Sequence, residues 1–122
     1  MADLPAEDAQ TAICRAVLDA LPDPVLIYDD SCVLYANAAA NRILGGSEPS
    51  KLLGMSVENF ILPDLAEINN ARRAYVLNQG VEIRDLILKI RDLEGRPTVL
   101  RVDIKPIRFD GATVAMATLA HR

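Results

Sequence analysis

The stretch VLYANAAANRILGG, from Val33 to Gly46, reads as a strand that passes directly into a helix. The β-branched and aromatic residues before Asn37 favour a strand. The Asn37 side chain can accept a hydrogen bond from an amide of the following turn, which makes it a good N-cap. Ala38 to Leu44 favour a helix, and the two glycines accept the left-handed backbone that ends one. The sequence therefore predicts a strand-to-helix connection with almost no reactive chemistry around it.

The segments before this stretch predict an amphipathic helix and a first strand. Apolar residues recur at helical spacing from Glu7 to Leu21, and the prolines that follow end the pattern. Val25 to Tyr28 are apolar in both alternating phases, which is typical of a strand covered on both faces. Asp29 to Ser31 supply turn chemistry before a second strand that begins at Cys32. The two strands are therefore expected to form a hairpin.

The middle of the chain predicts short helical pieces followed by one longer helix. Prolines and Gly54 interrupt the first part, and the longer helix is expected from Asp64 to Asn78. Asp64 and Glu67 have the spacing of a capping box, with aspartate in place of serine. The side of this helix that we expect to face the core carries Leu65, Ile68, Ala71 and Tyr75.

The last third of the chain predicts three strands. Apolar and charged residues alternate from Leu86 to Ile90, and a change of phase before them predicts a bulge near Arg84 and Asp85. The turn RDLEGRP leads to a second alternating strand, and Asp110–Gly111 marks a tight turn before a last strand from Ala112 to Ala120. The fold class is therefore α+β: a five-stranded antiparallel sheet, with helices inserted between strands 2 and 3 and an N-terminal amphipathic helix.

Composition and charge narrow the class of protein. The 122 residues suit one domain, and a net charge of -4 argues against a nucleic-acid surface. No apolar run is long enough to span a bilayer, and the acidic N-terminus lacks the apolar segment of a signal peptide. A cytoplasmic location follows, with Cys14 and Cys32 as free thiols. We divide the chain into an acidic segment with a cap helix, residues 1–21, and a domain, residues 22–122.

The order of these segments resembles the PAS domain family. The stretches that carry the resemblance are LPDPVLIYDD, VLYANAAANRILG, SKLLGMSVENF, ILPDL, RDLEGRP and PIRFDGATVAMAT, from about Leu18 to Thr118. Three family positions match Asp29, Asn37 and Gly95. The first turn departs from the family pattern, because it reads DDSC and has no glycine.

The resemblance implies a sensory or interaction domain with a cavity between its helices and the inner face of its sheet. Such modules serve bacterial-type signalling proteins: two-component histidine kinases, cyclic-dinucleotide enzymes and transcription regulators. Family members that bind haem use a histidine on the long helix, and those that bind flavin covalently use a cysteine just before it. Neither residue is present there, and His121 lies at the chain end, so we expect neither cofactor. The sequence also predicts no metal site and no enzymatic activity.

Strand periodicity predicts the wall of the cavity. This wall is almost entirely apolar, with one hydroxyl group, and it either lines a ligand pocket or forms a filled core. A ligand would then be a small apolar or weakly polar molecule. The predicted pocket residues are Leu26, Tyr28, Leu86, Leu88, Ile90, Leu100, Val102, Ile104 and Met116.

The other face of the sheet and the first helix predict an interface. We expect an outer patch that includes Val25, Ile27, Ile87, Val99 and Ala115, and a helix that either lies on its own sheet or pairs with that of a second subunit. A homodimer follows from the second arrangement. The predicted interface residues are Ile13, Ala16, Val17, Ala20, Leu21, Ala117 and Leu119. Two functions remain open: a ligand sensor attached to an effector domain, and a ligand-free module for dimerisation or protein docking.

Overall fold

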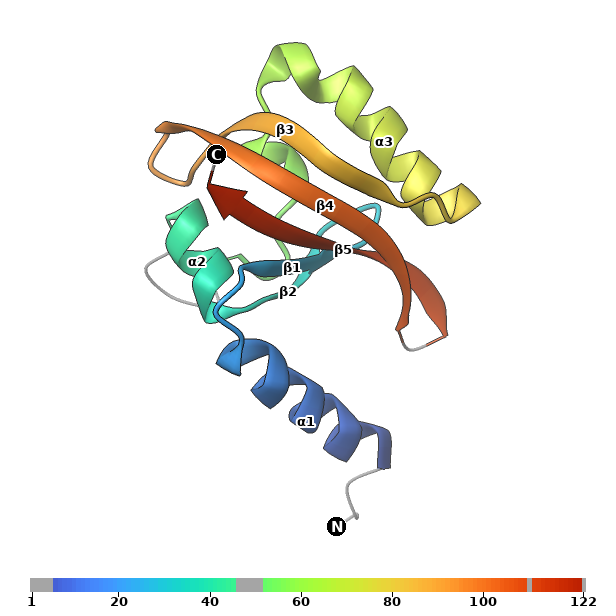
Figure 1. The fold of residues 1–122 in the computed structure, drawn as a ribbon. Helices are drawn as coiled ribbons and strands as arrows, with labels where there is room; N and C mark the ends of the chain where they lie inside the picture. The colour runs from blue at the N-terminus through green and yellow to red at the C-terminus, as the bar shows by residue number, and fades with distance from the viewer. Residues whose placement is uncertain (1–5, 46–51, 110, 122) are drawn as a thin grey trace.

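The predicted strand-to-helix connection is confirmed in a computed structural model that describes residues 6–45, 52–109 and 111–121 (Figure 1). Strand β2 (Val33–Ala36) runs into Asn37, whose side-chain oxygen accepts a hydrogen bond of 2.9 Å from the Ala40 amide at the start of helix α2 (Ala38–Leu44). Gly45 ends the helix with φ 82°. Gly46 lies outside the described residues.

The five strands form one antiparallel sheet, as predicted. Strands β1 (Val25–Tyr28), β3 (Ile83–Arg91), β4 (Pro97–Phe109) and β5 (Ala112–His121) join β2 in the order β2-β1-β5-β4-β3. The last strand therefore occupies the centre, beside the first. The inserted helices connect one edge of the sheet to the other, and they pack on its inner face (Figure 1).

The predicted bulge in β3 is confirmed. Ile83 pairs with Ile104 and Leu86 pairs with Val102, so β3 holds an extra residue between the two pairs. Asp85 takes up the bulge with φ 56°, in the left-handed region that non-glycine residues rarely enter. Its amide donates a hydrogen bond of 2.8 Å to the Asp103 carboxylate on the neighbouring strand.

The turn between β3 and β4 is organised by one buried carboxylate. Asp92 accepts hydrogen bonds of 2.9 Å from the amides of Glu94 and Arg96, and one of 3.1 Å from the Arg96 side chain. The Arg96 amide is the largest of the influences that lower the pKa of Asp92. Gly95 has φ 84°, so the turn needs glycine at this position, as the resemblance implied. Asp110 of the other predicted turn lies outside the described residues.

The inserted segment contains two 3-10 helices, η2 (Val57–Phe60) and η3 (Pro63–Leu65), followed by α3 (Ala66–Gln79). The predicted capping box is wrong: α3 begins after Leu65, and no side chain caps it. Asp64 instead belongs to the 3-10 turn that Pro63 starts, because a proline at the first helical position fits the turn without a lost hydrogen bond.

The predicted core-facing side of the long helix is wrong at Ile68, Ala71 and Tyr75, although Leu65 packs on the main core. Ile68 and Tyr75 are 48 % and 53 % exposed, whereas Val76 is fully buried. The helix turns Asn69, Arg73 and Val76 toward the sheet, since these positions share one face at spacings of four and three residues. The long aliphatic stem of an arginine can pack in a core, which explains why polarity alone misled the prediction.

The main core lies between the inner face of the sheet and the helices α2, η2 and α3. A second, smaller cluster on the outer face contains Val25, Ile27 and Val114, with Leu18 and Met116 packed against it. The two clusters explain why β1 is buried on both faces. The outer face of the first strand is therefore covered rather than open.

Helix α1 (Ala6–Ala20) extends away from the sheet, and the contacts that its described side chains make with the rest of the chain lie near its C-terminal end (Figure 1). Leu18 packs on the outer cluster, and the Tyr35 hydroxyl donates a hydrogen bond to Asp19. Ile13 and Val17, by contrast, are 64 % and 55 % exposed. The structure therefore does not show the first of the two predicted arrangements, in which α1 lies on its own sheet. None of the helices in the described segments has both the length and the apolar character needed to cross a bilayer.

Candidate functional site

A cavity of about 60 Å³ lies where the resemblance placed it, between the inner sheet face and the helices η2 and α3. Seven of the nine predicted pocket residues line it: Leu26, Tyr28, Leu88, Ile90, Leu100, Val102 and Ile104. Leu86 packs on the core but does not line the cavity, because it follows directly on the bulge. The remaining walls come from helical residues and from the last strand.

The predicted phase of β5 is wrong. Met116 packs in the outer cluster, whereas Ala117 and Leu119 line the cavity and Ala115 is buried in the main core. The register with β1 fixes this arrangement, since Leu26 pairs with Ala117 and directly paired residues share a face. Ala117 and Leu119 therefore lie on the inner face and are not available to an interface on the outer one.

Two polar side chains interrupt the apolar wall. Tyr28 is 7 % exposed, and its side chain lines the cavity. Burial raises the pKa of Tyr28 to about 12, against the opposing effect of the Arg73 charge, so the hydroxyl keeps its proton at neutral pH. Asn69 of α3 also lines the cavity. The cavity thus offers hydrogen-bonding groups from β1 and from α3.

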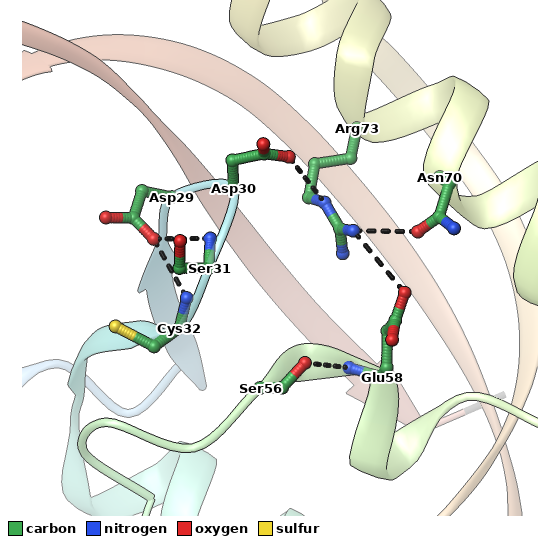
Figure 2. Close-up of polar contacts among 8 residues, drawn as sticks. All are labelled: Asp29, Asp30, Ser31, Cys32, Ser56, Glu58, Asn70 and Arg73. Carbon is green, nitrogen blue, oxygen red and sulfur yellow. Dashed lines mark hydrogen bonds and ion pairs between the residues drawn. The ribbon is translucent and has the colours of Figure 1, made fainter.

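Arg73 connects three elements in a group that we call the Arg73 clasp: Arg73, Asn70, Glu58 and Asp30 (Figure 2). The guanidinium donates a hydrogen bond of 2.7 Å to the Asn70 side chain. Its Nε lies 3.6 Å from an Asp30 carboxylate oxygen, and its Nη2 lies 3.7 Å from one of Glu58. The clasp therefore joins α3 to η2 and to the turn between β1 and β2.

The burial of the clasp is uneven. The Arg73 side chain is 9 % exposed, whereas those of Asp30 and Glu58 are 87 % and 52 % exposed. The Arg73 Nε is buried and has no hydrogen-bond partner among the described residues. The sequence analysis missed this residue, because it assigned the wrong face of α3 to the core. The sequence signal that could have revealed the burial of Arg73 is its position on the same helical face as Asn69 and Val76.

The turn that carries Asp30 forms without a glycine. One Asp29 carboxylate oxygen accepts hydrogen bonds of 2.8 Å from the amides of Ser31 and Cys32 (Figure 2). These bonds organise the turn, so Asp29 acts as a turn residue. Cys32 is half-buried and Cys14 is exposed, and both are free thiols.

Asn37 is the most completely bonded polar side chain of the described residues. It is fully buried, and its oxygen accepts hydrogen bonds of 2.9 Å from the amides of Val25 and Ala40. Its nitrogen donates to the carbonyls of Leu18 at 2.9 Å and Asp23 at 2.8 Å. The sequence analysis predicted the N-cap role of Asn37, in which its side chain accepts from the Ala40 amide. The other three bonds tie α1 and β1 to the same side chain.

Five predicted interface residues lie in α1 or directly after it, and all five are exposed in the isolated chain: Ile13, Ala16, Val17, Ala20 and Leu21. His121, at the end of β5, is exposed as well. Within the part of the chain that the structure describes, no three side chains of the metal-binding types are grouped to hold a metal ion.

A five-stranded antiparallel sheet with helices packed on one face, and a small apolar cavity between them, define the class of α+β domain to which the chain belongs. A family model described as PAS domain matches residues 22–121. The chain therefore belongs to the PAS domain family.

Solved PAS structures share this fold. The PAS domain of nitrogen regulation protein NR(II) from Vibrio parahaemolyticus is 24 % identical, with a TM-score of 0.71 over 90 % of this chain and 98 % of that one. A PAS domain from a two-component sensor histidine kinase is 13 % identical, with a TM-score of 0.68 over 95 % and 99 %. The LOV protein of Rhodobacter sphaeroides is 20 % identical, with a TM-score of 0.73 over 93 % and 67 %. No curated protein matches the sequence.

Proposed function

We propose that this PAS domain is the sensor of a larger signalling protein, and that it responds to a small molecule in its cavity. The observation that carries the proposal is the cavity itself, whose apolar walls hold two polar side chains, Tyr28 and Asn69. An apolar cavity with a few convergent polar groups is the usual form of a small-molecule site. The attached effector would be a histidine kinase, a cyclic-dinucleotide enzyme or a transcription regulator.

The volume of the cavity favours a very small ligand. Pockets for drug-sized ligands measure roughly 300–1,000 Å³, whereas this one measures about 60 Å³. A haem or a flavin would need the helices to move far from the sheet. The volume therefore supports a ligand of a few heavy atoms over either of these cofactors.

The output of the sensor would pass through a dimer of α1 helices. Ile13, Val17 and Leu21 form an apolar stripe that is 64 %, 55 % and 40 % exposed. Such a stripe gains stability when a second copy covers it, and a two-fold arrangement pairs the stripe with itself. Ala16 and Ala20 beside it allow close approach of two helices. The small charge of the chain, -4, is screened at ordinary salt and does not oppose this pairing.

A second function is favoured by the same small volume. If side-chain packing simply closes the cavity, the domain is a ligand-free module for dimerisation or docking, with α1 as its contact surface. Native and denaturing mass spectrometry of the purified chain, together with its absorption spectrum, separate the two functions. A reproducible mass that is lost on denaturation is the result expected for a sensor, and a ligand-free, colourless protein is the result expected for a docking module.

The dimer is tested by Val17→Asp. Placing an unpaired carboxylate in a buried contact costs about 2 kcal/mol or more, so we expect the wild-type chain to sediment as a dimer and the variant as a folded monomer. Val81→Asp is the matched control, because Val81 is 40 % exposed in a loop away from α1. A monomeric wild-type chain, or a variant that stays dimeric, would contradict pairing through α1. Because Val17 is exposed in the isolated chain, its replacement should leave the circular dichroism spectrum unchanged.

A further inference from the structure

The outer face of β3 and β4 carries a group of exposed side chains that we call the basic patch: Ile87, Lys89, Arg91, Val99 and Arg101. The residues that alternate with them along the middle of each strand belong to the main core, so strand alternation turns the patch away from it. Ile87 pairs directly with Arg101, and Lys89 pairs with Val99. Each aliphatic side chain of the patch therefore has a cation opposite it on the same face.

The three cations of the basic patch have no anionic partner within residues 6–45, 52–109 and 111–121. Two other arginines of the same region are paired. The Arg84 guanidinium lies 2.7 Å from a Glu82 carboxylate oxygen, and that of Arg96 lies 3.1 Å from one of Asp92. The patch therefore presents unpaired positive charge on a chain whose net charge is -4.

The aliphatic members of the patch are open to solvent as well. Ile87 is 47 % exposed and Val99 is 40 % exposed. They are diagonal neighbours on adjacent strands, a relation that places residues about 7–8 Å apart. The surface is hollowed beside Ile87, where Arg101, Asp85 and His121 line the same depression. The patch therefore combines apolar area with positive charge, and both can be complemented by an acidic protein surface.

We propose that the basic patch docks an acidic amphipathic helix of a partner protein. The apolar stripe of that helix lies on Ile87 and Val99, and carboxylates on its flanks reach the three cations. Residues three and four positions apart on a helix have Cβ atoms about 5–6 Å apart, a spacing close to that of the two aliphatic side chains. The nearby acidic residues of β3 and β4 lie at the bulge, where the Asp85 amide donates to Asp103. The carboxylates of the partner therefore gather toward Arg91, at the other end of the patch.

The arrangement of the molecule favours such a helix over two other occupants. A strand added at the sheet edge is obstructed, because the free side of the edge strand β3 is bridged by Ile61, which pairs with Ile90. The apolar stripe of α1 from a second copy is a poorer match in charge. The stretch from residue 13 to residue 21 holds one arginine and one aspartate, and the Asp19 carboxylate already accepts a hydrogen bond from Tyr35.

The test uses three synthetic peptides with the same stripe of leucine and alanine, and with glutamate, glutamine or lysine on the flanks. Each has about 18 residues, because shorter isolated helices are marginal in water. The isotopically labelled 122-residue chain is titrated with each peptide and followed by amide chemical shifts. We expect saturable shifts on β3 and β4 with the glutamate peptide, and an affinity that falls as salt is added. The glutamine peptide should bind about tenfold more weakly, and the lysine peptide should not bind.

Two variants with matched controls locate the site. Arg101→Gln should weaken binding of the glutamate peptide by about threefold, whereas Arg42→Gln removes the same charge from an exposed position on α2 and should change nothing. Ile87→Ser should weaken binding by about tenfold, because less apolar surface is covered. Ile68→Ser is its control, since Ile68 is 48 % exposed but lies on α3.

Equal binding of the three peptides, no binding of the glutamate peptide, or undiminished binding by both patch variants would overturn the proposal. Sedimentation of the chain without peptide adds a further test. If the wild-type chain is a dimer and Ile87→Ser converts it to a monomer, a second copy occupies the patch, and the acidic partner is likewise overturned. None of these outcomes bears on the cavity, so the proposed sensory function is decided separately by its own ligand.

Discussion

Replacing Asn37 with alanine should destabilise the fold more than any other change to a single polar side chain discussed above. The side chain is fully buried and makes four hydrogen bonds, two as acceptor and two as donor. Its partners belong to α1, the loop after α1, β1 and α2, so no single element can move to satisfy the groups that alanine would leave behind.

The magnitude follows from the four bonds. Loss of the N-cap bond to Ala40 costs about 1 kcal/mol. Each of the other three bonds, to Val25, Leu18 and Asp23, contributes about 1 kcal/mol, and more where the abandoned group stays dry. The expected loss is therefore about 4 kcal/mol. A domain of this length is stable by roughly 6–18 kcal/mol, so the variant should fold but unfold at much lower denaturant.

Urea unfolding followed by far-ultraviolet circular dichroism measures this loss. The matched control is Asn78→Ala, since Asn78 is exposed near the end of α3 and its replacement should change the unfolding free energy by no more than about 0.5 kcal/mol. A loss below about 1 kcal/mol for Asn37→Ala would mean that the cap alone matters. That result would refute the assignment of Asn37 as the link between α1 and the sheet.

Two further predictions concern the turn between β3 and β4 and the bulge in β3. The pKa of Asp92 is lowered in the folded chain, so its ionised form adds stability above the ordinary aspartate pKa of about 3.9 and loses it as the pH falls further. Asp92→Asn should therefore be less stable than wild type at pH 7, with a gap in urea midpoints that narrows below about pH 4; a gap independent of pH would contradict this. At the bulge, Asp85→Val should cost about 1–2 kcal/mol, because a β-branched residue resists positive φ. Asp85→Gly should cost nothing by the same assay, and equal losses would show that φ is not the cause.

The success of the sequence analysis depended on how local the signal was. Asn37 and Gly45 each act on the adjoining turn of α2. The cap and the end of this helix could therefore be predicted from neighbouring residues. The bulge at Asp85 could be predicted because a change of phase between apolar residues is visible in the sequence. Elements whose faces differ in polarity were therefore placed correctly.

The errors arose where both faces of an element have similar polarity. The last strand carries small or apolar residues in both phases, so alternation did not distinguish Met116 from Ala117, and only the pairing with β1 does. On α3, exposed Ile68 and Tyr75 outweighed Val76 in the sequence pattern. Arg73 could not be assigned to the core from its residue type, because its burial depends on a space that three separate elements create.

Strand β1 connects the two polar networks of the molecule. At one end Tyr28 lines the cavity and Asp30 meets Arg73, and at the other end the Val25 amide is bonded to Asn37. Asn37 in turn holds the Leu18 carbonyl in the last turn of α1.

A ligand that contacted Tyr28 in the cavity would act on the first end of β1, while Asn37 fixes the second end to the helix that we propose to pair with its copy. The described side chains of α1 contact the remaining chain at its last turn, through Leu18 and Asp19, so the direction of α1 depends on a few contacts. Small displacements of β1 would therefore change the direction of α1 more than they change the sheet. In the sheet, the central strand β5 is hydrogen-bonded to β1 on one side and to β4 on the other. In the proposed sensor, this difference in attachment lets a ligand of a few atoms alter the dimer without unfolding the core.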